Sequence, residues 1–273
     1  MILLLVLSIF LHQASSSPLS FSFSSFNKDS CSIGSLICTG SVTANYGYLS
    51  LTSDPLPGNS SSSSPSLPLN RIGRVLYNRP VLAWPATIST TFTIRISPYQ
   101  NSPGSADGLT FIFAPDSKPS PYYSYGSYLG IVDKFVSGGN VSQLAVEFDT
   151  YQNDFDIDGN HVGIDTISTM ETVAAVSLNR IGIDLKSGRM IKVQIDYDGW
   201  TEMLYVSLGY FGYPLQRVLE KSIILPETVP SSVYVGFTAA TGSLSESHQV
   251  LDWSFTTIPL PSSSLKNRKL IKP

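Results

Sequence analysis

Short segments in which apolar and polar residues alternate run through the whole chain, and this pattern restricts the fold most strongly. A period of two places one set of side chains against a core and the other toward solvent, as in a β-strand. No stretch combines the 3.6-residue apolar period with the capped start of a helix. With 20 Gly and 18 Pro to supply turns, the pattern predicts an all-β sandwich or jelly roll. The expected strands cover residues 19–23, 46–51, 91–96, 109–113, 144–148, 191–197, 204–208, 233–237 and 250–255.

The two ends of the chain indicate a secreted protein with one folded domain. Residues 2–11 form an apolar run followed by small residues, which is typical of a signal peptide over residues 1–17, although the usual basic start is missing. The run is about half of the roughly 20 residues that cross a bilayer, so no membrane span is expected. We expect one domain over residues 18–258 and a basic tail over 259–273. The expected location is extracellular, in the apoplast, with the vacuole as the alternative.

Charge and cysteine content agree with that location. The formal net charge of −3 gives no attraction to a phosphate backbone, so a nucleic-acid partner is not expected. Cys31 and Cys38 are the two cysteines, and in an oxidising compartment they are expected to form one local disulfide. Asn59 and Asn140 each begin an acceptor tripeptide for N-glycosylation.

An acidic segment over residues 147–165 predicts a cation site. It holds six carboxylates and no lysine or arginine, and carboxylates this close raise one another's pKa unless a cation lies among them. Oxygen ligands with one imidazole, that of His161, suggest Ca²⁺ beside a transition metal such as Mn²⁺. A solvated acidic loop is the alternative. It fits less well, because the strand expected over residues 144–148 places Glu147 and Asp149 on one face.

Two other motifs compete for the acidic segment. Residues 154–159 match the first half of an EF-hand loop, but Asp165 stands where that loop has its final glutamate, and strands flank the segment. Glu147 and Asp149 also match the start of the signature of sandwich-fold glycoside hydrolases. Tyr151 stands where that signature has its second carboxylate, so a hydrolase would need a carboxylate from elsewhere in the fold.

The acidic segment and several other blocks resemble the legume lectin (L-type lectin) family over nearly the whole chain. The early cysteine pair is similar to that of the lectin-like ectodomains of plant receptor kinases, although the sequence contains no kinase. The resemblance implies a single-domain legume-lectin jelly roll that binds glycans or glycoproteins and is not an enzyme. The matching blocks are residues 146–150 with Asn153 and Asp156, then 161–165, 106–115, 128–131, 235–242 and 251–255.

The same resemblance implies which residues bind the two metals. His161 taken alone would be an ordinary core histidine, but neutral imidazole among carboxylates favours a metal ligand. The family pattern also implies a cis peptide bond between Ala106 and Asp107. The implied Mn²⁺ ligands are Glu147, Asp149, Asp156 and His161, and the implied Ca²⁺ ligands are Asp149, the carbonyl of Tyr151, Asn153 and Asp156.

A sugar presents paired hydroxyls and one apolar face, so its site needs a carboxylate acceptor, an amide donor and an aromatic ring. The resemblance implies Asp107, Asn153 and Tyr151 in these roles. It also implies a backbone N–H from a Gly-Gly loop, in which Ser127 replaces the second glycine here. The implied carbohydrate-binding set is Asp107, Ser127, Tyr151, Asn153, Leu244 and Ser245.

The leading interpretation is therefore a secreted, non-catalytic, Ca²⁺/Mn²⁺-dependent lectin, which could form a homodimer by pairing of sheet edges. Ser127 motivates a second interpretation, a lectin-like domain that has lost simple-sugar binding and recognises an apolar small molecule or a protein. The glycoside hydrolase is the third.

Overall fold

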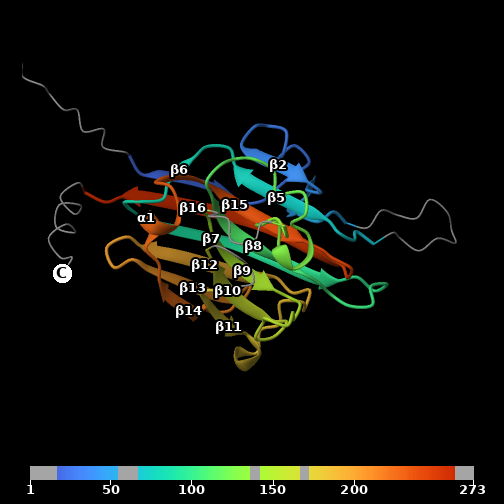
Figure 1. The fold of residues 1–273 in the computed structure, drawn as a ribbon. Coiled ribbons are helices and arrows are strands. Elements are labelled where there is room, and N and C mark those ends of the chain that lie inside the picture. Colours follow the sequence, from blue (N-terminus) through green and yellow to red (C-terminus); the bar gives the residue numbers. More distant parts are fainter. Residues whose placement is uncertain (1–16, 55–66, 136–141, 167–171, 262–273) are drawn as a thin grey trace, which may run out of the picture.

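The computed structural model describes residues 17–54, 67–135, 142–166 and 172–261, and its strands form two antiparallel sheets (Figure 1). The first sheet has the order β14 (Gln216–Ser222), β13 (Met203–Tyr210), β12 (Ile191–Asp198), β7 (Ala86–Pro98), β16 (Glu246–Pro259), β4 (Tyr48–Ser50) and β3 (Thr43–Asn45), and β1 (Leu19–Phe23) also pairs with β16. The second has the order β11 (Ala174–Ser177), β10 (His161–Asp165), β9 (Leu144–Asp149), β8 (Gly108–Ala114), β15 (Ser232–Ala240), β5 (Ile72–Tyr77) and β2 (Leu36–Gly40), and β6 (Val81–Leu82) also pairs with β15.

These sheets confirm the predicted all-β sandwich. Each strand expected from alternation overlaps a strand of the structure. The described helices are α1 (Leu225–Thr228) and two 3₁₀ turns, and none of them has the length to cross a membrane. The expected ranges do not include β14, because this edge strand is exposed along most of its length and has no apolar side to mark it. They also leave out β2, β3, β5, β6, β10 and β11.

Aromatic side chains join the two sheets. Phe92 from the first sheet contacts Phe237 from the second edge to face, with ring centroids 4.9 Å apart, and Phe237 contacts Trp253 in the same manner at 5.0 Å. All three are at most 1% exposed. The indole N–H of Trp253 donates a hydrogen bond of 3.0 Å to Thr90, so its polar atom is also satisfied. Such residues supply the largest share of hydrophobic stabilisation in a core.

The outer face of the second sheet carries a smaller apolar cluster, which fixes a loop. Ile112 and Ala145 point away from the main core and pack against Leu129 and Ile131 of the segment after β8. Thr238 strengthens this attachment by donating a hydrogen bond of 2.7 Å to the carbonyl of Leu129. The segment that begins with the 3₁₀ turn Gly126–Tyr128 is thereby held over the sheet.

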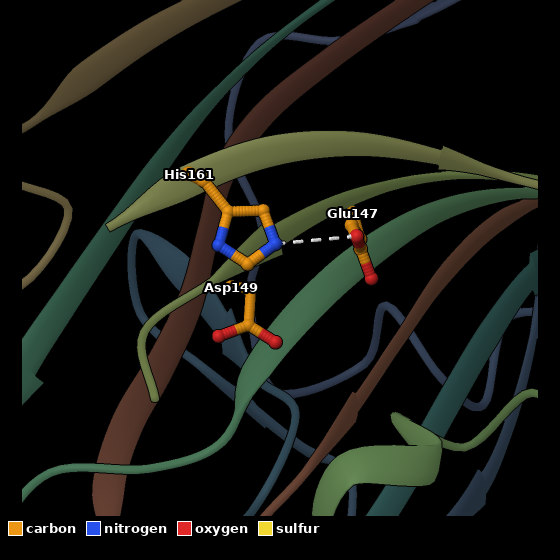
Figure 2. Close-up of side chains that lie close together, drawn as sticks. All are labelled: Glu147, Asp149 and His161. Carbon is orange, nitrogen blue, oxygen red and sulfur yellow. Dashed lines mark ion pairs between the residues drawn. The ribbon is translucent and has the colours of Figure 1, made fainter. Parts of the chain in front are cut away.

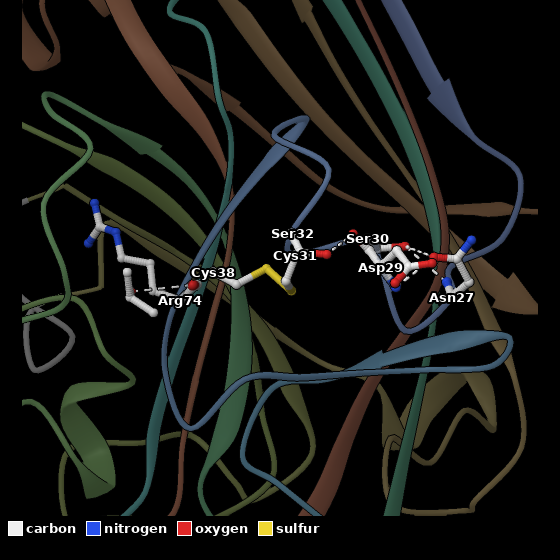
Figure 3. The surroundings of a disulfide bond; sticks show 8 residues. Asn27, Asp29, Ser30, Cys31, Ser32, Cys38 and Arg74 are labelled. Carbon is white, nitrogen blue, oxygen red and sulfur yellow. Dashed lines mark hydrogen bonds between the residues drawn. A yellow bond between two sulfur atoms is a disulfide. The ribbon is translucent and has the colours of Figure 1, made fainter.

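The predicted disulfide is present between Cys31 and Cys38, beside β2 (Figure 3). Other expectations about the chain ends and modifications fall outside the described residues. These are positions 1–16 of the expected signal peptide, Asn59, Asn140, and positions 262–273 of the expected tail.

Candidate functional site

Three titratable side chains meet on the outer face of the second sheet. Glu147 and Asp149 are two residues apart on β9, so both point outward, and His161 on β10 lies opposite Asp149 in the antiparallel register. Figure 2 shows the three side chains facing one another. Their ligand atoms lie within 4.8 Å of one another, and the three residues are between 1% and 4% exposed. Of the implied metal-binding side chains, these three form the tightest group.

The hydrogen bonds of His161 prepare one ring nitrogen for a cation. Nδ1 donates to the carbonyl of Asp158 at 2.6 Å, which leaves Nε2 facing Glu147 Oε1 at 3.4 Å. Burial lowers the pKa of His161, but the hydrogen bond to Glu147 and the charges of Asp149 and Glu147 outweigh it and raise the pKa to about 9. Burial raises the pKa of Asp149 well above its usual value. The cluster therefore attracts a cation, which can be a proton or a metal ion.

Two residues of the matching block over residues 161–165, neither of which was given an individual role, shape the space around Glu147. Gly163 lies opposite Glu147 in the β9–β10 register, and a Cβ atom there would come within 2.1 Å of Glu147 Oε1. Asp165, on the same face of β10, is 1% exposed, and its burial together with the charge of Glu147 raises its pKa well above the usual range. The alternation of residues 161–165 could have placed Gly163 and Asp165 on the face of His161.

The loop after β9 folds back toward these carboxylates. Asp149 Oδ1 accepts a hydrogen bond of 2.7 Å from the backbone N–H of Tyr151, and Asp156 Oδ2 accepts one of 2.7 Å from that of Asn153. Burial raises the pKa of Asp156. The side-chain oxygen of Asn153 is buried and has no hydrogen-bond partner among the described residues. The loop thus presents an unpaired oxygen acceptor beside an acidic cluster.

A lysine from a distant segment supports the same loop. Lys186 Nζ donates to the carbonyls of Thr150 and Gly159, at 2.6 Å each, and so ties together the two ends of the acidic loop. The acidic segment itself contains no basic residue. Lys186 lies 21 positions beyond the end of the segment, and nothing in the sequence predicts that it contacts the loop. Lys186 bonds carbonyl oxygens, so the carboxylates stay free for a cation.

Asp158, which the family pattern leaves unassigned, has a separate role in the loop. Its carboxylate accepts hydrogen bonds from the backbone of Asn160 at 2.9 Å, from the side-chain amide of Asn179 at 3.0 Å, and from the hydroxyl of Ser177. These donors satisfy the carboxylate without a metal ion.

A depression of about 430 Å³ lies next to this loop. It brings together five of the six residues expected to bind carbohydrate, although they come from four separate parts of the chain. Ser245 lies outside it, because this residue is fully buried and its hydroxyl donates to the carbonyl of Pro68 at 3.2 Å. The five residues that line the depression are Asp107, Ser127, Tyr151, Asn153 and Leu244.

Asp107 provides the acidic group of this depression. The Ala106–Asp107 peptide bond is cis, as expected. The carboxylate atom Oδ2 is buried and accepts no hydrogen bond from the described residues, and a Cβ at Gly242 would lie 3.0 Å from it. Burial and the charge of Glu246 raise the pKa of Asp107 to about 7, against the opposite effect of the Gly242 backbone.

Glu246 lies beneath the depression and was not assigned an individual role from the sequence. It is fully buried and accepts hydrogen bonds from Ser105 at 2.8 Å, from His248 Nε2 at 2.9 Å, and from the hydroxyl of Thr150. The backbone N–H of Thr150 in turn donates to the carbonyl of Asp107 at 3.0 Å. The loops that carry Asp107 and Tyr151 are therefore joined through one buried carboxylate.

Comparison with known proteins agrees with this geometry. The family model for the legume lectin domain matches residues 18–272. The chain is 31% identical to the erythroagglutinating phytohemagglutinin of Phaseolus vulgaris over 269 residues, which covers 93% of this chain and 90% of that protein. Among solved structures, a seed lectin of Lotus tetragonolobus matches with a TM-score of 0.74 and 30% identity, over 89% of this chain and 100% of that chain.

The similarity to receptor kinases concerns only part of those proteins. The chain is 36% identical over 193 residues to a probable L-type lectin-domain containing receptor kinase S.5 of Arabidopsis thaliana, which covers 68% of this chain but 29% of the kinase. The glycoside hydrolase alternative has no support among these relatives, which are lectins and proteins with lectin domains. The chain belongs to the legume lectin family, and it is a non-catalytic, carbohydrate-binding lectin with that family's β-sandwich.

Proposed function

We propose that the protein is a secreted lectin whose carbohydrate binding depends on Ca²⁺ and Mn²⁺. One observation carries the proposal. The buried cluster of Glu147, Asp149 and His161 attracts a cation, and the loop that connects β9 and β10 passes from this cluster directly to the depression that holds Asn153 and Tyr151. The metal ions would then fix the loop that forms half of the carbohydrate site.

The residues fit the two ions by their chemistry. Mn²⁺ accepts one imidazole among carboxylates, and the hydrogen bond from His161 Nδ1 to a carbonyl orients Nε2 as the ligand atom. Ca²⁺ prefers oxygen ligands, and the unpaired side-chain oxygen of Asn153 is one of them. Bound ions would neutralise the buried carboxylates. The proposed ligands are Glu147, Asp149, Asp156 and His161 for Mn²⁺, and Asp149, the Tyr151 carbonyl, Asn153 and Asp156 for Ca²⁺.

The groups that line the depression have complementary roles toward a sugar. The Asp107 carboxylate accepts hydrogen bonds from two adjacent hydroxyls, and the Asn153 amide nitrogen donates one while its oxygen holds calcium. The ring of Tyr151, which is 39% exposed, packs against the apolar face of the sugar. The backbone N–H at Ser127 provides a further donor. Its side chain and that of Leu244 restrict which sugar fits.

A glycan array probed with and without a chelator tests the proposal. The metal-loaded protein should bind a defined subset of glycans, and the chelator and the Asp107→Ala substitution should each abolish this signal. Asp29→Ala is the matched control, because Asp29 is an exposed aspartate near the disulfide, outside the depression. Asp107→Ala should keep its bound metal. If the metal-loaded protein binds no glycan, the proposal is wrong, and a domain that recognises an apolar molecule or a protein is favoured.

Secretion and homodimer formation are further parts of the proposal. The apolar run at residues 2–11 and the Cys31–Cys38 disulfide support passage through an oxidising compartment. N-terminal sequencing of the protein recovered from the extracellular fluid should give a start near residue 18, with the vacuolar fraction as the comparison. Light scattering of the purified protein should give twice the chain mass if sheet edges pair.

A further inference from the structure

A second depression of about 560 Å³ adjoins the proposed carbohydrate site. Asn70 and Tyr125 line both depressions, so the two lie next to each other and share part of their walls. The walls come from β2 and β5 on one side and from residues 119–125 on the other. The volume lies within the range of small-molecule sites in proteins, and none of the functions described so far uses it.

Arg74 of β5 gives this depression a buried positive charge. The residue is 5% exposed, and the buried Nε atom of its guanidinium has no hydrogen-bond partner among the described residues. Figure 3 shows the guanidinium pointing away from the disulfide. Burial lowers the pKa of Arg74 to about 10, against the opposite effect of the Asp116 charge, so the group stays charged at neutral pH. Because buried charges in proteins are almost always paired, a buried guanidinium with an unsatisfied Nε atom favours an anionic ligand.

The described lining of the depression adds positive charge and no carboxylate. Arg71 also lines the depression, and the described lining residues include no aspartate or glutamate. Lys134 Nζ lies 5.4 Å from the ring centre of Tyr125 at the margin. Asp116 lies near enough for its charge to act on Arg74, but it does not line the depression and forms an ion pair of 2.9 Å with Lys118. A local excess of positive charge thus exists on a chain whose formal net charge is −3.

Three tyrosines supply flat apolar surfaces around the charge. Tyr122 is 81% exposed and Tyr123 is 39% exposed, and their rings meet edge to face with centroids 4.8 Å apart. Tyr125 lies at the junction of the two depressions. Exposed tyrosines beside a concave surface provide the amphipathic contacts that a pyranose ring uses, since one face of the ring is apolar.

We propose that this second depression is a subsite for an acidic sugar, a uronate residue linked to the sugar that Asp107 binds. The uronate carboxylate pairs with Arg74 and Arg71, because a guanidinium matches a carboxylate in charge and in fork geometry. Its ring lies against Tyr122 and Tyr125. This inference rests on the proposed carbohydrate binding and extends it from one sugar to an acidic oligosaccharide.

The test is an array of uronate-containing oligosaccharides, each printed beside its uncharged methyl ester. The metal-loaded protein should bind the free acid about tenfold more strongly than the ester, as expected for a charge-assisted hydrogen bond. Arg71→Gln should lower this ratio without bringing it to one, because Arg74 still faces the carboxylate, and neutral glycans should remain bound. Tyr122→Ala should weaken the acid and the ester equally. Both residues are exposed, so neither substitution should unfold the protein. Arg79→Gln is the control, because it removes an exposed arginine outside both depressions.

The outcomes separate the subsite from the function on which it rests. Equal binding of acid and ester, or an acid preference that is the same in Arg71→Gln as in the wild type, would overturn the subsite and leave the lectin proposal standing if neutral glycans bind. Absence of all glycan binding would overturn both. Arg74→Gln is informative only if its circular dichroism and melting curve match the wild type, and the exposed variants carry the test otherwise.

Discussion

The two faces of β9 are buried to the same degree but are completed in different ways. On the inner face Phe148 is fully buried against other side chains of the chain itself. On the outer face Glu147 and Asp149 are 2% and 4% exposed, yet their carboxylates face other acidic groups and one histidine. The inner face is therefore completed by the chain itself, whereas the outer face gathers carboxylates that the proposed metal ions would neutralise. The alternation of side chains along β9 thus places one set in the hydrophobic core and the other set in the candidate metal site.

The largest expected effect concerns the inner face alone. Phe111→Ala on β8 removes a fully buried ring that contacts Phe92, Phe237 and Trp253, and it should lower the free energy of unfolding by about 3–5 kcal/mol. Chemical denaturation with and without metal measures it. The loss should be the same in both conditions, and a loss seen only with metal would show that the two faces are not independent.

A somewhat smaller effect is expected for the outer face. Each bound ion should raise the free energy of unfolding by about 2.7 kcal/mol at a metal concentration 100 times its Kd, because the ions bind only the folded state. Asp149→Asn should lose both the bound metal and this increment. Asp158→Asn is the matched comparison and should keep its metal, because protein donors satisfy Asp158. Unchanged melting temperature and metal content after exhaustive chelation would contradict the cation site.

Lys186 should contribute both to the stability of the protein and to the metal affinity of the acidic loop. Lys186→Met deletes two charge-assisted hydrogen bonds to loop carbonyls and should cost about 2 kcal/mol, together with weaker metal binding in a calcium titration. The control is Lys118→Met, which removes an exposed lysine in a surface ion pair and should change stability by less than about 1 kcal/mol. Equal effects of the two substitutions would argue against a role for Lys186 in the loop.

The smallest expected effect is a shift in pH dependence. Asp107 accepts sugar hydroxyls as a carboxylate, and its pKa is raised to about 7, so sugar binding should strengthen as pH rises through that value. Glu246→Gln removes the neighbouring negative charge and should move the midpoint to lower pH by less than about one unit. Binding measured between pH 5 and 8 for both proteins gives the two midpoints. An unchanged midpoint would mean that Glu246 does not act on Asp107 through its charge.

The alternation of apolar and polar residues predicted structural features that are determined by residues close together in the sequence. It identified the strands over residues 109–113 and 144–148, and it placed Glu147 and Asp149 on one face, as the structure has them. The resemblance to a known family added Asp107 as a site residue. Without that resemblance, Asp107 and its neighbours in the sequence predict only a turn. Both kinds of evidence concern short segments.

The remaining features depend on contacts between distant segments, which no local pattern marks. Lys186 approaches the acidic loop from another part of the chain, and Glu246 joins Ser105 to Thr150 across more than 90 positions. In the sequence Arg74 looks like an ordinary strand residue. Its place in a depression follows only from the fold, in which the segment over residues 119–125 forms the opposite wall. Ser245 was expected in the carbohydrate site, but the structure gives its hydroxyl a buried partner at Pro68.

Calorimetric titration of the strongest array glycan tests the coupling of metal to sugar most directly. The titration would compare three samples, namely the metal-loaded protein, the protein stripped of metal as verified by elemental analysis, and the stripped protein after return of Ca²⁺ and Mn²⁺. We expect one binding site per chain in the loaded protein, no measurable heat in the stripped protein, and recovery after the metals return. Equal affinity in the loaded and the metal-free samples would contradict the coupling of metal to sugar.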